Sequence, residues 1–461
     1  MWTLLIAAAV IVATYTAIIQ PLYLDPLSRI PGPKLYALTK WRLAFEDWKG
    51  QRTRTIHRLH QEYGAVVRIG PNEVHFNSLS AQKTIYGPGS GFGRTAFYRM
   101  FDVYGEQNLF TFHSSREHGE RKKLLASAYS KSKISRGPVA EMVARKIRDY
   151  LRLIEERRGE ADEVFTSLHS YSLDSITDFL YGSWGATQAM KGNEKHRALL
   201  DDILDPARRR LSWFAVHFSN YTKWLYSRDG FLGRLVEPLL PMKKPSTYTG
   251  IRAHALEASQ RFQEATQTVK TDPAASSTII GRLHDHVSKG TARLSDLEIA
   301  SECADHFPAG IDTTSDTLTF LIWSLSLPRN SHIQQKLIEE VNAIPATDLD
   351  AYGSPTVEAA DRLPYFGAVI KETLRLYAPL PASEPRSSDL DSVIDGHEIP
   401  AGTVVCMSPY SLHRNSEVFP EPSKWDPERW LLGDESEILA RMQKSWYWPF
   451  SSGARMCIGM Q

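Results

Sequence analysis

The chain has 461 residues, with 54 Lys and Arg against 53 Asp and Glu, and a formal net charge of +1. This balance gives no electrostatic reason to expect a nucleic-acid partner. The three cysteines, Cys303, Cys406 and Cys457, are far apart and form no C-x-x-C pair. Such spacing argues against a disulfide framework and fits a reducing compartment.

The first 24 residues form the most apolar part of the chain, and residues 2–24 carry no charged side chain. As a helix they would span the roughly 30 Å hydrocarbon core of a bilayer. A signal peptide would instead show a basic start, a shorter apolar run and a small-residue cleavage site. The residues that follow are basic: Arg29, Lys34, Lys40 and Arg42. We therefore expect an uncleaved transmembrane anchor over residues 1–24, with the rest of the chain in the cytosol.

A proline-rich hinge over residues 25–40 is predicted next, because Pro31-Gly32-Pro33 cannot continue a helix. Residues 65–77 predict a β-hairpin around Gly-Pro-Asn, and residues 393–407 predict further strands and turns. Most of the remaining chain is helical in character and shows no internal repeat. The pattern predicts a mainly α structure with small β-sheets, in the α+β class.

A long helix is predicted to begin at Ser295 and to end near Leu327. Ser295-Asp-Leu-Glu298 is a capping box, with a serine at the N-cap and a glutamate three residues later. Pro308 lies inside this helix, where it removes the hydrogen bond to the carbonyl of Ala304 and predicts a kink.

The segment 309–314 of this helix, Ala-Gly-Ile-Asp-Thr-Thr, breaks local helix rules. Gly310 costs about 1 kcal/mol of helix propensity relative to alanine. One explanation is a groove that admits a small ligand, where Thr313 relays a hydrogen bond and Asp312 delivers protons through water. The alternative is that the hydroxyls of Thr313 and Thr314 bond back to the helix and only bend it.

Two later motifs carry charged side chains. Glu372 and Arg375 lie at i, i+3 on one predicted helix face, where they can pair. Downstream, residues 425–430 read Trp-Asp-Pro-Glu-Arg-Trp and contain Arg429. A buried carboxylate flanked by two guanidiniums can be fully hydrogen bonded.

The most specific motif is Phe450-Ser-Ser-Gly453-Ala-Arg455-Met-Cys457-Ile-Gly459. A thiolate held in such a turn is suited to ligating a haem iron, and the alternative is a buried structural cysteine. The absence of C-x-x-C-H argues against covalently attached c-type haem. The segment matches the haem-binding signature Phe-x-x-Gly-x-Arg-x-Cys-x-Gly of the cytochrome P450 family, and the chain resembles that family nearly throughout.

The resemblance implies the cytochrome P450 fold, with one catalytic domain over residues 41–461 that holds haem b on Cys457. It implies that Asp312 and Thr313 deliver protons during oxygen activation, and that Arg429 joins Glu372 and Arg375 in holding the cysteine loop. It also places several side chains near the haem propionates: Arg455, Arg386, His118 and Lys122. The family often has Trp and Arg where His118 and Lys122 stand. The basic residues 121–123 could instead form a solvated face or a docking patch for a reductase.

The resemblance further implies a single-pass endoplasmic reticulum enzyme that uses O2 and electrons from an NADPH-cytochrome P450 reductase. No GxGxxG fingerprint follows a strand, so the electrons should come from a separate protein. Aromatic residues within 92–112 and 213–218 resemble regions that roof a pocket for a lipophilic substrate. The chain looks most like fungal secondary-metabolism members, which act on terpenoids, polyketides or alkaloids.

Two alternatives stay open. The first is a haem-thiolate isomerase or dehydratase. The second is an inactive truncated member or an incomplete gene model, because only four residues follow Cys457. On that pattern the catalytic domain would lack its C-terminal helix and β region, and this chain would bind haem weakly.

Overall fold

The computed structural model describes residues 1–159, 161, 163–226, 228, 230–239, 249–268, 275–431 and 437–460. Residue 461, the end of the expected catalytic domain, lies outside these ranges. Helices dominate the described chain and two small sheets accompany them, which confirms the expected mainly α architecture with small β-sheets.

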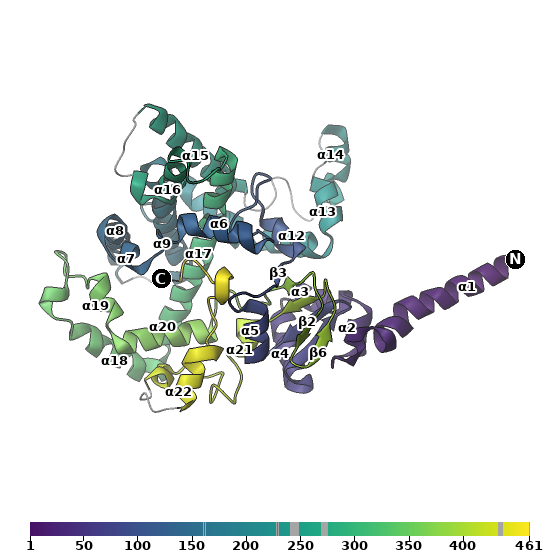
Figure 1. The fold of residues 1–461 in the computed structure, drawn as a ribbon. Helices are drawn as coiled ribbons and strands as arrows, with labels where there is room; N and C mark the ends of the chain where they lie inside the picture. Colours follow the sequence, from purple (N-terminus) through teal and green to yellow (C-terminus); the bar gives the residue numbers. More distant parts are fainter. Residues whose placement is uncertain are drawn as a thin grey trace.

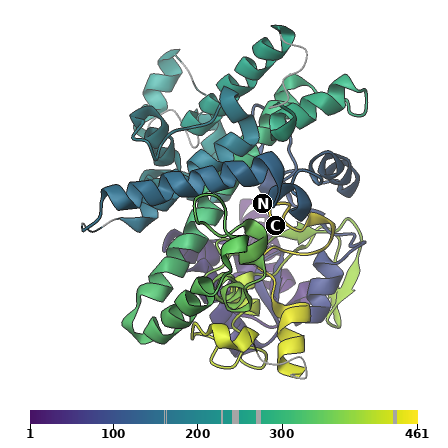
Figure 2. The same cartoon turned by 90° about the vertical axis from the view of Figure 1, so that its left-hand side faces the viewer.

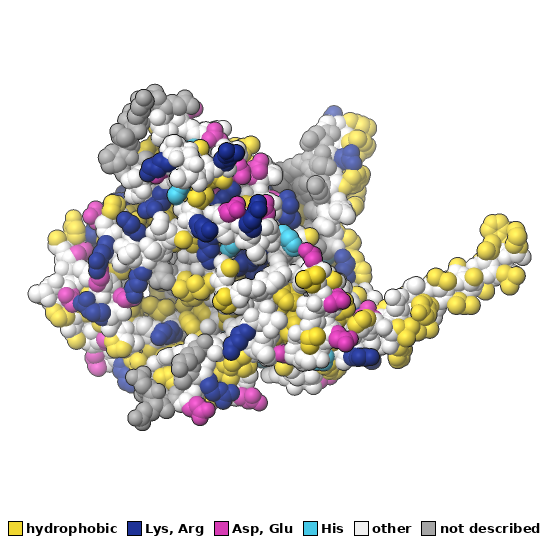
Figure 3. Space-filling view, in the orientation of Figure 1, with side chains coloured by type: hydrophobic (Ala, Val, Ile, Leu, Met, Phe, Trp, Pro, Cys, Tyr) yellow, Lys and Arg dark blue, Asp and Glu magenta, His cyan; other side chains and the backbone are white. Residues whose placement is uncertain are grey.

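The N-terminal segment is one continuous helical rod. It consists of α1 (Trp2–Thr14) and a π-helical continuation, η1 (Tyr15–Leu24), with Pro21 inside the latter. This rod projects from the body of the molecule (Figure 1), and apolar side chains cover most of it (Figure 3). The rod is 23 residues long, and its most apolar 18-residue stretch has a mean hydropathy of 2.2 and is not buried. By length and composition the rod could cross a membrane.

The larger sheet has five strands in the order β1-β2-β7-β4-β3. The strands are β1 (Val66–Gly70), β2 (Glu73–Phe76), β3 (Gly93–Arg94), β4 (Arg386–Ser387) and β7 (Val404–Cys406). The predicted hairpin is present as the antiparallel pair β1–β2, and β7 lies parallel to β2. The second sheet pairs β5 (Ser392–Ile394) with β6 (His397–Ile399). The short strands β3 and β4 place Arg94 directly opposite Arg386.

The helices before the long helix α17 are α2 (Lys34–Leu38), α3 (Trp41–Trp48), α4 (Arg52–Tyr63), α5 (Leu79–Tyr86), α6 (Ser115–Leu125), α7 (Lys131–Ile134), α8 (Gly137–Glu156), α9 (Val164–Tyr181), α10 (Glu194–Arg197), α11 (Asp201–Leu204), α12 (Pro206–His217), α13 (Ser219–Tyr226), α14 (Gly230–Val236), α15 (Thr249–Thr268) and α16 (Ile279–Ser288). The later ones are α17 (Asp296–Ser326), α18 (Ser331–Asn342), α19 (Val357–Asp361), α20 (Pro364–Leu376), α21 (Pro409–Leu412) and α22 (Glu437–Arg441). Both views place the teal α15 and α16 at one end of the molecule and the yellow α22 at the other (Figures 1 and 2).

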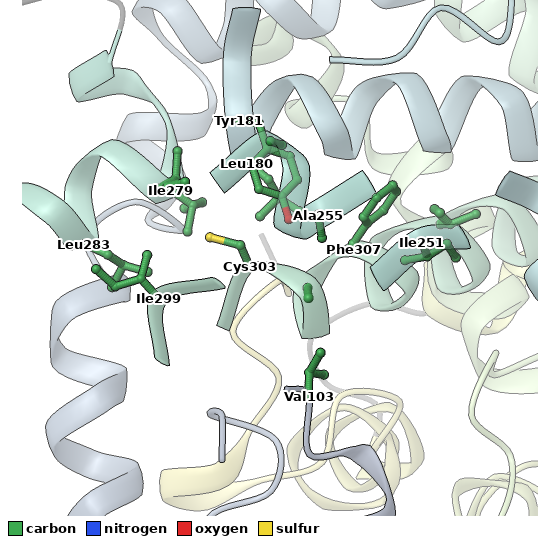
Figure 4. Packing of buried hydrophobic residues seen from close by; sticks show 14 of the residues in the cluster. Val103, Leu180, Tyr181, Ile251, Ala255, Ile279, Leu283, Ile299, Cys303 and Phe307 are labelled. Atoms are coloured by element: carbon green, nitrogen blue, oxygen red, sulfur yellow. The ribbon is translucent and has the colours of Figure 1, made fainter. Parts of the chain in front are cut away.

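The long helix α17 follows the sequence expectation closely. Ser295 is its N-cap, and the reciprocal capping-box hydrogen bonds with Glu298 are both present. The helix continues through Pro308 and ends at Ser326, one residue before the predicted end. Its first half packs against α9, α15 and α16 in the largest apolar core, where Cys303 is fully buried (Figure 4).

The structure gives a packing reason for the glycine at position 310, which the sequence reasoning did not include. A Cβ atom at Gly310 would lie 2.5 Å from Cγ1 of Ile176 on α9. Glycine is therefore needed here because α9 and α17 approach each other closely, while the groove expected in this segment stays a prediction.

The aromatic cluster on α12 packs against the N-terminal helix α3. The rings of Trp48 and Trp213 lie 5.1 Å apart, and Trp213 Nε1 donates to the carbonyl of Ala44 at 2.9 Å. His217 Nε2 lies 2.7 Å from Asp47 Oδ2. These contacts attach α12 to α3, while the expected role of the cluster in roofing a pocket stays a prediction.

Candidate functional site

The cysteine loop, residues 450–459, is closed by its own backbone and seated against α5. The N–H of Cys457 donates to the carbonyl of Phe450 at 2.8 Å. Gly453 has φ +66°, and a Cβ there would lie 2.3 Å from the carbonyl oxygen of Tyr86. Only glycine combines this left-handed backbone with such a close approach. The first glycine of the motif therefore lets the loop dock on the end of α5.

Cys457 is the accessible cysteine. All three cysteines lie in described segments, and Cys303 and Cys406 are buried whereas Cys457 is exposed. Burial raises the pKa of the Cys303 and Cys406 thiols. The protein around Cys457 also raises the pKa of its thiol, while the N–H of Gly459 and the charge of Lys122 lower it. Cys457 is thus the cysteine that could ligate an iron.

The structure gathers Glu372, Arg375 and Arg429 in one buried cluster. Arg375 donates twice to the Glu372 carboxylate, from Nε and Nη2, each at 2.8 Å. The same carboxylate accepts from Arg429 Nε at 3.1 Å and from the backbone N–H of Asp426 at 2.9 Å. Trp430 Nε1, whose part the sequence reasoning missed, donates at 3.0 Å. Glu372 and Arg375 have no exposed side-chain surface, so their charges are compensated entirely inside the protein.

A buried histidine connects this cluster to the cysteine loop. His413 Nδ1 donates to the carbonyl of Arg375 at 2.9 Å, and its Nε2 accepts from the backbone N–H of Trp448 at 2.8 Å. Burial and the neighbouring Arg375 lower the pKa of His413 to about 3, so the imidazole is neutral as both bonds require. Trp448 Nε1 in turn donates to Ser452 at 3.0 Å. No sequence pattern marks His413, apart from its place between the two charged motifs.

A group of buried arginines lies beside the cysteine loop. Arg94 and Arg386 face each other across the β3–β4 pair, an arrangement that like charges disfavour. Arg386 is balanced by Tyr98, 2.7 Å away, and by Glu384, 3.3 Å away. Arg94 donates only to backbone carbonyls, and its buried Nε has no partner among the described residues. Sequence reasoning missed Arg94, which lies in an irregular aromatic segment.

Arg455 completes the arginine group. Its guanidinium donates to the carbonyls of Phe112 at 2.8 Å and His113 at 2.6 Å, and no carboxylate among the described residues pairs with it. Burial and the neighbouring arginines lower the pKa of both Arg94 and Arg455 to about 10. The group therefore carries excess positive charge in a poorly solvated place, which an anionic ligand would relieve.

His118 and Lys122 lie on α6 next to this group, but neither is a free cation. Burial, together with Arg455 and Arg94, lowers the pKa of His118 to about 3, so His118 is neutral and can offer only a hydrogen bond. Its expected place near the haem propionates stays a prediction. Lys122 donates to the carbonyls of Ala454 at 2.8 Å and Met456 at 2.9 Å. Lys122 thus holds the cysteine loop from the side.

Helix α6 also contacts α17, through an ion pair of Arg121, the residue before Lys122. Arg121 is 4% exposed, so the solvated-face alternative is wrong for this residue. Its Nη1 lies 2.7 Å from Oε2 of the fully buried Glu302. Glu302 also accepts from the backbone N–H of Leu109 at 3.1 Å and from His306 at 3.2 Å. Successive residues of α6 therefore join α17 to the cysteine loop.

This pairing gives a testable expectation for stability. Glu302→Gln should lower the free energy of unfolding by about 2–3 kcal/mol, because it removes the fully buried carboxylate that pairs with Arg121 and leaves that guanidinium with the longer contact to the partly exposed Glu298. Glu298→Gln is the matched control, since Glu298 is partly exposed, lies 3.4 Å from Arg121 and keeps an oxygen for the helix cap. Denaturant unfolding of both variants beside the parent protein measures the difference. Equal stability of the two variants would contradict this account of Glu302.

Asp312 and Thr313 lie in the middle of α17. Thr313 Oγ1 donates to the carbonyl of Ala309 at 2.7 Å, which is the back-bonding alternative described above. Asp312 points toward α9, where its Oδ1 lies 3.7 Å from Nε2 of His169. His169 is another residue that sequence reasoning did not single out.

These residues fit haem. The fit rests on an accessible thiol beside three arginines, of which Arg386 pairs with Glu384 while Arg94 and Arg455 donate to backbone carbonyls, and the buried Nε of Arg94 has no partner among the described residues. Haem b brings an iron that a thiolate can ligate and two carboxylates that guanidiniums can bind. The described residues contain no group of three or more His, Cys, Asp or Glu side chains able to hold a metal ion by themselves.

The sequence model of the cytochrome P450 family matches residues 31–461, and the chain belongs to this family. Haem with a cysteine thiolate as axial ligand is the cofactor of the family. The chain is 29% identical to cytochrome P450 monooxygenase aflV of Aspergillus parasiticus, with 100% of this chain and 86% of the relative aligned. It is also 29% identical to monooxygenase stcB of Emericella nidulans, over 95% of this chain and 79% of the relative. Monooxygenase tazI of Aspergillus terreus is 29% identical over 96% and 84%. The enzyme class is therefore P450 monooxygenase.

Proposed function

We propose that this protein oxidises a lipophilic small molecule in the biosynthesis of a fungal secondary metabolite, a terpenoid, polyketide or alkaloid. The single observation that carries the proposal is the exposed Cys457, held in a closed loop beside Arg94 and Arg455, whose guanidiniums donate to backbone carbonyls. The fungal sources and names of its relatives support the oxidative activity.

When bound, haem supplies the redox chemistry that splits O2 and gives one atom to the substrate and the other to water. Cys457 would ligate the iron through its thiolate, and the loop contacts from Phe450 and Lys122 would hold that sulfur in place. Arg94, Arg386 and Arg455 would bind the propionates. The residues of the Glu372 cluster act at a distance, since among the described residues hydrogen bonds through His413 and Trp448 connect them to the loop.

The proton-handling residues would be Asp312 and Thr313 on α17. A carboxylate is able to take a proton from solvent and pass it on through water, and the Asp312 side chain is 43% exposed. Thr313 would have to exchange its bond to Ala309 for one to a ligand in order to take part. Both residues lie on the helix that Arg121 and Lys122 tie to the cysteine loop.

A lipophilic substrate is supported by aromatic side chains close to the arginine group. The ring of Phe110 contacts those of Tyr98 and Phe101 edge to face, with ring centroids 5.2 and 5.3 Å away. The Arg94 guanidinium lies over the rings of Tyr98 and Phe110 at 4.9 and 4.6 Å. Apolar walls with few polar anchors are typical of sites for such ligands.

The redox partner would be an NADPH-cytochrome P450 reductase in the endoplasmic reticulum membrane. The apolar helical rod α1–η1 would anchor the protein there, with the catalytic part on the cytosolic side. Cytochromes P450 take their electrons from a partner protein, and an anchor in the same membrane keeps the two at a high effective concentration.

Labelled dioxygen tests this proposal. The protein is co-expressed with a fungal reductase in microsomes, supplied with NADPH and isotopically labelled O2, and offered a panel of terpenoids, polyketides and alkaloids. A product that carries one labelled oxygen atom and forms only with NADPH is expected. A rearranged or dehydrated product without the label would instead establish an isomerase or dehydratase. Asp312→Asn is the informative variant, because it should lower product formation at least tenfold.

A further inference from the structure

A buried histidine on α9 faces the acidic residue of α17. His169 is 1% exposed, and its Nε2 lies 3.7 Å from Oδ1 of Asp312. Its other nitrogen, Nδ1, lies 2.7 Å from the carbonyl oxygen of Phe165. A carbonyl can only accept, so Nδ1 carries the hydrogen. The ring orientation is therefore fixed, with Nε2 aimed at the carboxylate.

The helices α9 and α17 that carry His169 and Asp312 are in close contact near this pair. Ile176 lies seven residues after His169, about two turns further along α9, and contacts the position of Gly310, two residues before Asp312. Because that contact has no room even for a Cβ atom, the two helices cannot approach more closely, and the pair is held by the rigid crossing of α9 and α17.

The charges that face His169 come from α17. They are Asp312 and, one turn later, Asp316. The basic residues of the adjacent α8, Arg145 and Lys146, pair with Asp178 near the other end of α9, each at 3.0 Å. His169 thus faces carboxylates rather than cations, and a second hydrogen on Nε2 would give it a charged pair with Asp312.

We infer that His169 is a positioning residue for oxygen activation, which holds the Asp312 carboxylate in one orientation beside Thr313. The inference rests on the proposed role of Asp312 in proton delivery. An exposed carboxylate on a helix would otherwise sample several rotamers, whereas one paired with a buried imidazolium keeps one orientation. Burial alone would lower the pKa of His169, but the contacts with Asp312 and Phe165 outweigh it and raise that pKa.

The first test measures the pair itself. Histidine ring resonances are titrated in the reduced, carbon-monoxide-bound holoprotein, which is diamagnetic, and His169 is identified from the resonance missing in His169→Gln. We expect the pKa of His169 to lie above its usual value of about 6.5 and to fall by about one unit or more in Asp312→Asn. His254, which is bonded to the carbonyl of Gly185 at 2.8 Å, is the control and should not move. A His169 pKa that does not change in Asp312→Asn would overturn the inference.

The second test measures proton delivery. Hydrogen peroxide released per NADPH consumed is recorded with the reductase and no added substrate, across a range of pH. His169→Gln and Asp312→Asn should both raise this ratio several-fold, the double variant should match Asp312→Asn, and His254→Gln should leave it unchanged. An increase in Asp312→Asn alone would overturn the positioning role of His169. No increase in either variant would overturn the proposed role of Asp312 and with it that of its partner, even if the titration shows the charged pair.

Discussion

Replacing Cys457 with serine is expected to abolish the thiolate-type Soret absorption of the reduced, carbon-monoxide-bound protein. A serine hydroxyl does not ionise near neutral pH, so it cannot supply the anionic sulfur that defines this spectrum. The arginine group is untouched by the change, and some haem should still bind through its carboxylates. The expected result is therefore a haem-containing protein with an altered spectrum and at least a hundredfold loss of oxidation.

Cys303→Ala is the matched control for this experiment. Cys303 is buried in the core between α9, α15, α16 and α17 and has no access to the cysteine loop surface. Its replacement should leave the thiolate spectrum in place, with a modest loss of stability from the small cavity. Retention of the thiolate spectrum in Cys457→Ser, or its loss in Cys303→Ala, would show that the assignment of the ligand is wrong.

Glu372→Ala is expected to have the largest effect on stability. It leaves Arg375 and Arg429 buried without the carboxylate that compensates them, a change that costs about 3–5 kcal/mol for one broken pair. Because native domains are stable by only about 5–15 kcal/mol, most of the protein should fail to accumulate in folded form. Folded yield in membranes and the denaturant midpoint of any folded fraction measure the effect.

Two further variants separate local from general damage. Lys371→Ala changes the exposed neighbour on the same helix and should alter stability by less than about 0.5 kcal/mol. Arg375→Lys keeps the charge but loses the planar fork that serves Glu372 and the carbonyls of His413 and Pro422. We expect Arg375→Lys to resemble Glu372→Ala. A stable, haem-binding Glu372→Ala protein would contradict the role of this cluster in supporting the cysteine loop.

Features that depend on neighbouring residues were predicted well from the sequence. The capping box at Ser295 and the apolar pattern after it gave the bounds of α17, and the turn at Gly-Pro-Asn gave the hairpin β1–β2. Both are set by hydrogen bonds between residues three or four positions apart or by a short turn. The motif around Cys457 likewise gave the family, because its fixed positions are contiguous.

Features that depend on distant partners were not predicted. Arg94 matters because a two-residue strand places it opposite Arg386, and no periodic pattern marks strands that short. Glu302 and His306 could have been noticed as titratable residues four positions apart on one helix, but their partners Arg121 and Tyr129 come from another part of the chain. The reason for Gly310 was likewise hidden, since it depends on Ile176 of α9.

The central claim is that Cys457 ligates haem in a site built from the arginine group and the cysteine loop. The most direct test is the absorption spectrum of this chain, reduced and exposed to carbon monoxide, after expression in membranes with a supply of haem. The account predicts a thiolate-type Soret shift with close to one haem per folded chain. A folded protein that binds haem without that shift, or that binds no haem, would contradict it.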